Sequence, residues 1–311
     1  MPNLTHDRLA ENTAPAIRAY LGGSFDPVHK GHLQMAMYVY QHLLPIAKQQ
    51  QRALHVSLLP NARSPFKNES TNPKHRLAML KLATLNTPLQ IDELELWQAP
   101  PVYTIDSVRT LRQRYPHDSL IFIMGMDSAR SLDKWKDGLK LTDYVDLWVF
   151  NRGGFSDSDD HLFDINTHLA EKKPAMQTLA NLQTQLHAQL PIEMQNKTTD
   201  SPAELVALPT PTPTPTQTQA DSSVLKNPHQ GRIYIDPRPI SAISSTQIRQ
   251  QLQNLGNQPN IMPSAEAQIT SIPSINDIIG NTESNPFAKW LNPAIYQYII
   301  AHQLYSAAQF R

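Results

Sequence analysis

The stretch of sequence that decides the fold reads Leu21-Gly22-Gly23-Ser24-Phe25-Asp26-Pro27-Val28-His29-Lys30-Gly31-His32. An apolar run at residues 16–21 leads into it, and a helix-like stretch at residues 32–50 follows it. This order predicts a strand, a glycine turn and the start of a helix. Glycines let a backbone approach a bulky anion closely, and a helix N-terminus adds unpaired N–H groups and partial positive charge. The segment therefore predicts a phosphate-binding turn.

Two histidines in this stretch lie three positions apart, His29 and His32 on either side of Gly31. At that spacing both rings can face one point. Three interpretations stay open from the residues alone. The rings bind phosphate, they cap or pack the helix, or they form part of a zinc site, although no third ligand is apparent nearby. Gly22 and Gly23 fit a tight turn and a phosphate cradle equally well.

Outward from this stretch, short apolar runs alternate with helical patterns. We expect strands at residues 17–21, 53–59, 89–96, 120–124, 145–150 and 232–235. We expect helices at residues 32–50, 74–84, 105–115, 128–139, 245–252 and 293–305. Strand–helix alternation predicts an α/β fold, a Rossmann-like doubly wound parallel sheet with helices on both faces. Such sheets bind ligands at the carboxyl ends of their strands.

The pattern of strands and helices is interrupted twice. Residues 155–230 are polar and include a Pro-Thr repeat at 209–216, which predicts a flexible, extended insertion. A helix at 166–190 is compatible with the apolar spacing inside it. Residues 256–286 form a second weakly patterned insertion. We therefore expect a single domain made of residues 16–154 and 231–306.

Bulk composition restricts the class of protein. The 311 residues carry 27 basic and 27 acidic side chains, so the net charge gives no support to non-specific nucleic-acid binding. The chain has no cysteine, which excludes disulfides and thiolate metal sites and fits a cytoplasmic enzyme. We find no secretory signal at the N-terminus and no apolar run long enough for a membrane span, so we expect no membrane partner.

A second motif far downstream reads Ile243-Ser244-Ser245-Thr246-Gln247-Ile248-Arg249. Together with His29-Lys30-Gly31-His32, it resembles the paired motifs of the nucleotidylyltransferase superfamily. The resemblance implies that His29 and His32 stabilise the α- and β-phosphates of ATP. It implies that Ser244, Ser245, Thr246 and Arg249 hold the triphosphate, with Arg249 also catalytic. The alternative is an ordinary serine helix cap with a surface arginine.

Further segments narrow the resemblance to the bacterial nicotinate-nucleotide adenylyltransferases. Glu95 followed by Tyr103-Thr104-Ile105-Asp106, and Gly125-Met126-Asp127-Ser128 followed by Trp135, match stretches of that family. The resemblance implies ATP contacts at Gly22, Gly23, Ser24, Phe25, Asp127 and Lys67. It implies nicotinate-nucleotide contacts at Tyr103, Thr104 and Trp135. It also implies Mg²⁺ bound with ATP, while the residues that hold a metal stay unknown.

The implied reaction is adenylyl transfer from ATP to nicotinate mononucleotide, giving deamido-NAD and pyrophosphate. The chain departs from the family at Phe66, which replaces a histidine, at Val102, which replaces a serine, and around Trp97-Gln98, where the family has an arginine. The long insertions are also not typical of the family. Related acceptors stay open, namely nicotinamide mononucleotide and phosphopantetheine, and so does a non-catalytic nucleotide sensor. Plainer interpretations also stay open for single residues: Asp26 in a turn, Lys67 in an exposed loop, Asp127 and Thr104 as helix caps, and Trp135 in packing.

Overall fold

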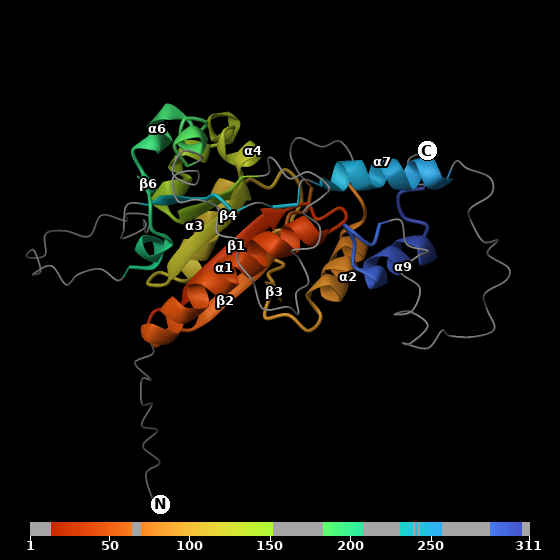
Figure 1. Ribbon diagram of the computed structural model, residues 1–311, viewed down its shortest axis with the longest axis horizontal. Helices are drawn as coiled ribbons and strands as arrows, with labels where there is room; N and C mark the ends of the chain where they lie inside the picture. The colour runs from red at the N-terminus through yellow and green to blue at the C-terminus, as the bar shows by residue number, and fades with distance from the viewer. Residues whose placement is uncertain are drawn as a thin grey trace, which may run out of the picture.

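The computed structural model describes residues 14–63, 70–151, 183–207, 231–238, 240–241, 243–256 and 287–306. Its centre is a seven-stranded sheet in the order β3-β2-β1-β4-β5-β7-β6, in which every pair of neighbours is parallel (Figure 1). The strands are β1 (Ile17–Gly23), β2 (Leu54–Pro60), β3 (Gln90–Ile91), β4 (Ser119–Gly125), β5 (Asp146–Phe150), β6 (Thr198–Thr199) and β7 (Ile233–Asp236). The predicted Rossmann-like α/β fold is confirmed.

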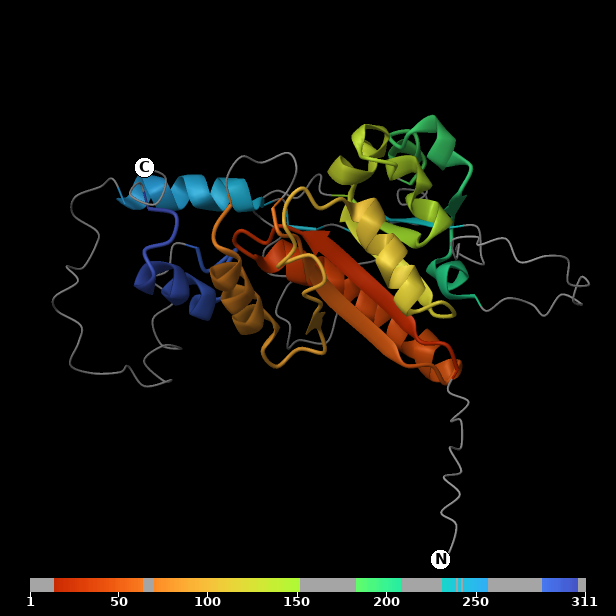
Figure 2. The ribbon, with the colours of Figure 1, turned by 180° about the vertical axis from the view of Figure 1, so that it is seen from behind.

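Helices cover both faces of the sheet. They are α1 (Lys30–Gln49), α2 (Pro73–Thr84), α3 (Thr104–Arg114), α4 (Met126–Ala129), α6 (Ile192–Gln195), α7 (Ser245–Gly256), α9 (Pro293–Ala301) and the 3₁₀ helices η1 (Leu132–Lys134), η2 (Gly138–Asp143) and η4 (Pro202–Val206). Helix α1 lies on one face and α3 on the other, as the two opposite views show (Figures 1 and 2). Helices α7 and α9 lie together beside α2, at one end of the molecule. No helix among these described residues is both long and apolar enough to cross a membrane.

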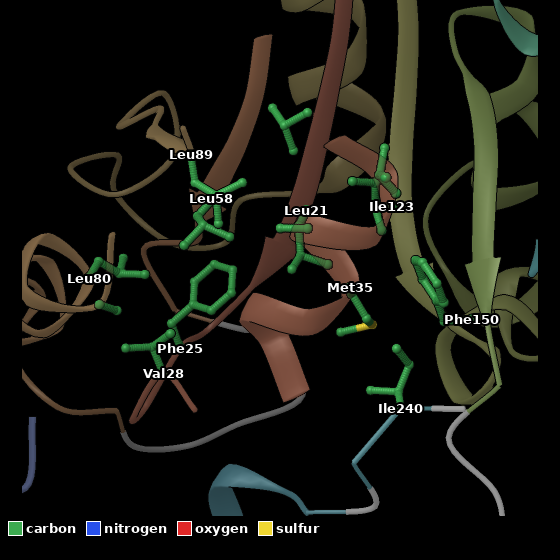
Figure 3. Close-up of a cluster of buried hydrophobic side chains, with 14 of the residues drawn as sticks. Leu21, Phe25, Val28, Met35, Leu58, Leu80, Leu89, Ile123, Phe150 and Ile240 are labelled. Atoms are coloured by element: carbon green, nitrogen blue, oxygen red, sulfur yellow. The ribbon is translucent and has the colours of Figure 1, made fainter. Parts of the chain in front are cut away.

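Strands β1, β2, β4, β5 and β7 send alternate side chains to two separate hydrophobic clusters. From β1, Ile17, Ala19 and Leu21 join the cluster under α1, whereas Tyr20 joins the cluster under α3. Figure 3 shows the first cluster, where Leu21 and Phe150 from two strands surround Met35 of α1. Because both faces are covered, the strands read as continuous apolar runs. This is why the sequence indicates β1, β2, β4, β5 and β7.

The direction of strand order reverses between β1 and β4. From β1 the chain moves to β2 and β3 on one side, and then returns to place β4 on the other side of β1. Such a switch point leaves a crevice between the carboxyl ends of the two strands. Residues 22–24 at the end of β1, and Gly125 and Asp127 at the end of β4, lie at this crevice. The fold therefore positions the glycine turn where a nucleotide site is expected.

Two predicted elements differ from the structure. The strand expected at residues 89–96 is reduced to Gln90–Ile91, and turns follow it. The helix expected at 128–139 is replaced by α4, η1 and η2. Ser131 Oγ donates to the carbonyl oxygens of Asp127 and Ser128, at 3.0 and 3.1 Å, which competes with regular helix bonding. Asp137 then adopts a left-handed backbone with φ of 49°, which ends any continuous helix.

Part of the predicted flexible insertion is folded against the sheet. Residues 183–207 supply β6, which pairs with β7, and the buried side chains of Leu186, Leu190, Met194, Leu205 and Val206. The prediction of a flexible insertion at 155–230 is therefore wrong for residues 183–207, because burial of these apolar side chains holds that part against the sheet. Of the possible helix at 166–190, residues 183–187 are helical. The Pro-Thr repeat and residues 257–286 lie outside the described residues.

Candidate active site

The end of β1 is closely packed at Gly22, where a side chain would fit only if the ring of Phe122 moved. A Cβ atom added to Gly22 would lie 2.4 Å from Cζ of Phe122 on β4. Phe25, three residues later, has a left-handed backbone with φ of 47° and a fully buried ring. That ring meets the imidazole of His32 edge-on, with centroids 4.9 Å apart. The side chain of Phe25 therefore belongs to the core, and only its backbone is available for the predicted ATP contact.

His29 and His32 form one stacked unit at the start of α1. Their ring centroids are 3.7 Å apart with an interplanar angle of 28°, and both side chains are buried. The backbone N–H of His29 donates to Nδ1 of His32 at 3.3 Å. Because Nδ1 accepts a hydrogen bond here, the neutral His32 ring carries its proton on Nε2, where it is a donor. The structure thus brings the two predicted rings together.

Gly31 makes room for this histidine stack. A Cβ atom at Gly31 would lie 3.2 Å from the His29 ring and 3.2 Å from the carbonyl oxygen of Ser241. Ser241 precedes the second motif, and its backbone N–H donates to Oε1 of Gln34 on α1 at 3.0 Å. The segment that leads into the second motif is therefore packed directly against the first.

The second motif opens α7 with a capping box. Ser244 Oγ accepts from the backbone N–H of Gln247 at 3.2 Å, and Gln247 Oε1 accepts from the N–H of Ser244 at 2.9 Å. Ser245 Oγ donates to the carbonyl oxygen of Pro27 at 2.9 Å, and Arg249 Nη1 donates to that of Asp26 at 2.6 Å. Motifs 218 positions apart thus meet at the N-terminus of a 12-residue helix. Thr246 is exposed at this helix start.

Asp26 has a structural explanation in this arrangement. Its buried carboxylate accepts from the N–H of Thr71 at 3.1 Å and from the hydroxyl of Tyr305 at 2.7 Å. Burial, and secondarily the charge of Asp26, hold the pKa of Tyr305 well above its usual range, so its hydroxyl stays protonated as a donor. Asp26 therefore joins the first motif to the end of the chain, as the turn interpretation of this residue allowed.

A cavity of about 600 Å³ opens at the switch point beside the glycine turn. Of the predicted ATP residues it contains Gly22, Gly23, Ser24 and Asp127. Of the predicted acceptor residues it contains Tyr103, Thr104 and Trp135. His29, His32 and Arg249 are not among the residues that line it. The cavity thus joins part of the predicted ATP set to the predicted acceptor residues.

One end of the cavity combines a helix start, aromatic rings and a cation. Tyr103 is the N-cap residue of α3, and Thr104 is the first residue of that helix. The half-buried Trp135 ends η1. Lys136 Nζ lies 4.5 Å from the centroid of the Tyr103 ring and 3.0 Å from Oδ2 of Asp106. This end can attract an anion on a flat ring, through N–H groups, the helix dipole and the ammonium group.

A buried carboxyl group also lines the cavity. Glu95 is 6% exposed, and burial raises its pKa from 4.5 to about 7. The nearby charge of Asp92 raises this pKa further, whereas the Ser107 hydroxyl lowers it. Glu95 is therefore close to half-protonated at neutral pH, which is a property of functional sites and of some structural ones.

The remaining predicted residues have varied positions. Asp127 is exposed and pairs with Arg130 at 2.6 Å, which leaves its carboxylate at the cavity wall. Lys67 and Phe66 lie outside the described residues. No group of three or more His, Cys, Asp or Glu side chains gathers in the part of the chain that the structure describes. The zinc interpretation of the histidine pair therefore finds no third ligand there.

Sequence reasoning missed several residues that line the cavity. They are Asn61, Ser131, Lys134 and Lys136 among the polar ones, and Phe122 and Met124 among the apolar ones. Asn61 directly follows β2, so its place at the carboxyl edge of the sheet was a usable signal. Lys134 and Lys136 flank Trp135 in the sequence. The irregular turn that aims them at the cavity had no signal.

The chain is similar in sequence to known proteins of one family. The profile of the cytidylyltransferase-like family matches residues 20–251. A probable nicotinate-nucleotide adenylyltransferase of Idiomarina loihiensis is 34% identical over 167 residues, 52% of this chain and 76% of that protein. A second one, of Pseudoalteromonas atlantica, is 41% identical over 145 residues, 46% of this chain and 62% of that protein.

A solved structure shares the fold. It is the nicotinic acid mononucleotide adenylyltransferase of Plasmodium falciparum complexed with NaAD, with a TM-score of 0.50 and 16% identity. The similarity covers 93% of this chain and 97% of that one. At this identity the likeness supports the fold alone.

Proposed function

The chain belongs to the cytidylyltransferase-like family, and from this membership we propose that it is a nicotinate-nucleotide adenylyltransferase of NAD biosynthesis. One observation carries the proposal. A single cavity joins the glycine turn after β1 to Tyr103, Thr104 and Trp135. A phosphate-binding turn and an anion-attracting aromatic end in one cavity fit the two substrates of this reaction, ATP and nicotinate mononucleotide.

The chemistry asks for alignment more than for proton transfer. An oxygen of the acceptor's 5′-phosphate forms a bond to the α-phosphorus of ATP, the bond from that phosphorus to the β-bridging oxygen breaks, and pyrophosphate leaves with the electron pair. The second pKa of a phosphate monoester is about 6, so the nucleophile is mostly a dianion at pH 7 and needs no general base. The protein's part is positioning and electrostatic stabilisation.

In this proposal the paired motifs hold the ATP phosphates. The Nε2–H of His32 and the ring of His29 donate toward the α- and β-phosphates, at the N-terminus of α1. Ser244, Ser245 and Thr246 present the N-terminal N–H groups of α7. Arg249, already oriented by the carbonyl of Asp26, offers its remaining N–H groups to the leaving pyrophosphate. Lys67 and the backbone of residues 22–25 complete the triphosphate site, and Asp127 accepts from the ATP ribose.

The acceptor binds at the other end of the cavity. Trp135 stacks on the nicotinate ring, and the N–H groups at Tyr103 and Thr104 contact its carboxylate. Val102 lines the cavity, and its backbone N–H still offers a main-chain contact to the carboxylate, whereas a side-chain contact is lost with the family's serine. These roles rest on the family resemblance and on the shared cavity.

We further propose that Mg²⁺ enters with ATP. The described residues gather no set of three acidic or histidine ligands, which suits an ion held mainly by substrate phosphates and water. When bound, the ion neutralises charge on the triphosphate. A cytoplasmic location and the lack of nucleic-acid partners stay predictions from composition.

The test is a pyrophosphate-release assay with ATP and Mg²⁺. The acceptors are nicotinate mononucleotide, nicotinamide mononucleotide and phosphopantetheine, and His32→Ala is assayed beside the wild type. We expect turnover on the acid, and a loss of about 100-fold or more in the variant because a preorganised donor to the phosphates is removed. His42→Ala is the matched control, since His42 is exposed on the same helix.

Three outcomes would contradict the proposal. Faster turnover on nicotinamide mononucleotide or phosphopantetheine would show that nicotinate mononucleotide is not the acceptor. Tight ATP binding without pyrophosphate from any acceptor would indicate a nucleotide sensor. Equal activity of His32→Ala and wild type would remove the histidine pair from the mechanism.

A further inference from the structure

Arg76 on α2 is fully buried, and its guanidinium group is hydrogen-bonded to four backbone carbonyl groups. Nη1 donates to Ser24 at 2.8 Å and to Asn61 at 2.7 Å. Nε donates to Thr71 at 3.1 Å, and Nη2 donates to Ala62. We propose that Arg76 is a positioning residue, which fixes the glycine turn against the end of β2 and thereby sets the shape of the substrate cavity.

The four carbonyl groups come from three separate segments. Ser24 belongs to the turn after β1, Asn61 and Ala62 follow β2, and Thr71 precedes α2. Two of these residues, Ser24 and Asn61, line the cavity. A second bond supports the same assembly, since the backbone N–H of Asn61 donates to the carbonyl of Gly23 at 3.0 Å. A shift of the guanidinium group would therefore be transmitted directly to the cavity wall.

Asp26 is hydrogen-bonded to the same assembly. Its carboxylate accepts from the N–H of Thr71, whose carbonyl oxygen accepts from Arg76. Burial lowers the pKa of Arg76 and the charge of Asp26 raises it, but an arginine stays protonated in proteins. A permanent cation thus lies beneath a turn that we assign to phosphate. Its planar fork of five donors suits several carbonyl groups at once, and the three donors of a lysine on one nitrogen cannot reach all four.

The chain offers a matched control for this role. Arg112 on α3 is 1% exposed and also donates to four carbonyl groups, those of Tyr144, Tyr115, Pro116 and Asp118. None of these residues lines the cavity. Asp118 directly precedes β4, so Arg112 serves the amino end of the sheet. Arg76 and Arg112 therefore make similar hydrogen bonds to backbone carbonyl groups, but only those of Arg76 reach residues that line the cavity.

The experiment compares Arg76→Lys, Arg76→Met and Arg112→Lys with the wild type, and it rests on the proposed function for its assay. We measure thermal midpoints, the folded fraction, and kcat and KM for ATP and nicotinate mononucleotide per folded molecule. We expect all three variants to lose stability. We expect kcat/KM to fall by at least about 10-fold in the Arg76 variants only, with a raised KM for ATP, because small misplacements of binding groups are costly.

A merely structural role would lower the folded fraction without changing KM. Unchanged KM and kcat per folded molecule in Arg76→Lys would overturn the inference, as would an equal kinetic loss in Arg112→Lys. Should neither Arg76 variant fold, amide hydrogen exchange of the wild type decides instead. The inference is supported if the backbone amides of Asn61 and Thr71 exchange only when the whole protein unfolds. It is overturned if both amides exchange through local opening of low free energy. A wild type inactive on every acceptor would instead count against the proposed function.

Discussion

At the scale of single residues, the candidate site depends on a few side chains whose state is set by one neighbour each. His32 is the clearest case, because one hydrogen bond to Nδ1 decides that the neutral ring donates from Nε2. Arg249 is oriented in the same way by the carbonyl oxygen of Asp26. Two further residues, Lys136 and Glu95, lead to predictions at this scale.

Lys136 should favour an acid acceptor over an amide. Its ammonium group lies at the cavity end that holds Tyr103, where the proposed nicotinate carboxylate would bind. We expect Lys136→Gln to lower kcat/KM about fivefold for nicotinate mononucleotide and to leave nicotinamide mononucleotide unchanged, as for the loss of an exposed ion pair worth ~1 kcal/mol. Lys140→Gln is the control, since Lys140 is exposed and pairs with Asp137 outside the cavity. Equal losses on both acceptors would contradict this role.

Glu95 should make stability fall as pH rises. Its pKa is raised in the folded state to about 7, so the folded protein binds the proton more tightly than the unfolded chain does. That stabilisation is complete below pH 4.5 and is lost as pH rises through 7. We expect the free energy of unfolding of Glu95→Gln, relative to that of the wild type, to rise by about 1–3 kcal/mol between pH 5 and pH 8.

Urea denaturation at the two pH values measures this effect. Glu93→Gln, at an exposed position two residues earlier, is the control. The facing groups, Asp92 and Ser107, are unchanged in both variants. If the difference in free energy of unfolding between Glu95→Gln and the wild type were the same at both pH values, the pKa of Glu95 would not be raised.

At the scale of elements, the irregular segment from α4 to η2 places side chains both in the cavity and in the core, which one regular helix could not do at these positions. By breaking after Ala129 it directs Trp135 and Lys136 to the cavity, while Leu132 and Leu141 stay buried in the core. The turn is close-packed: a Cβ at Gly138 would lie 2.1 Å from the carbonyl oxygen of Leu132 and 2.8 Å from Cβ of Trp135. Glycine is required there by space.

Gly138→Ala should therefore disturb the acceptor end selectively. A backbone oxygen cannot yield as a flexible side chain can, so the turn that carries Trp135 must shift. We expect a stability loss of about 1–3 kcal/mol, a raised KM for nicotinate mononucleotide and an unchanged KM for ATP. Asp133→Ala, at an exposed position of η1, should change none of these. A rise in KM for ATP alone would show that this turn serves the other substrate.

At the scale of the whole molecule, the end of the chain holds the first motif in place. Tyr305, just after α9, donates to Asp26 across 279 positions of sequence. The carbonyl oxygen of Trp290, just before α9, accepts from the N–H of Lys30 at 2.9 Å. The C-terminal segment and α7 thus support the histidine turn together.

Tyr305→Phe tests this long-range support. Removing the hydroxyl leaves the buried carboxylate of Asp26 with one fewer donor, which should cost about 1–3 kcal/mol of unfolding free energy. We also expect a lower kcat/KM in the pyrophosphate-release assay, because Asp26 and Arg249 share the same turn. Tyr296→Phe, in the half-buried part of α9, is the control. Wild-type stability together with wild-type activity in Tyr305→Phe would contradict the argument.

Several features of this protein are specified by local chemistry and can be predicted from the residues alone. Strands β1, β2, β4, β5 and β7 are apolar runs of the correct length, and Ser244 and Gln247 form the cap of α7 by themselves. The two motifs can be paired from their residues, since both bind one polyphosphate in the superfamily that they resemble. Each of these signals lies within a short stretch of residues, so the sequence alone is enough to predict the feature.

Other features exist only because distant parts of the chain meet. The four carbonyl groups on Arg76, the bond from Tyr305 to Asp26, and the raised pKa of Glu95 depend on burial and on partners far away in sequence. Strand β6 exists because β7 offers it an edge, although its own two threonines are a weak signal. Such features arise from which surfaces meet in the folded chain, and no window of sequence contains both surfaces.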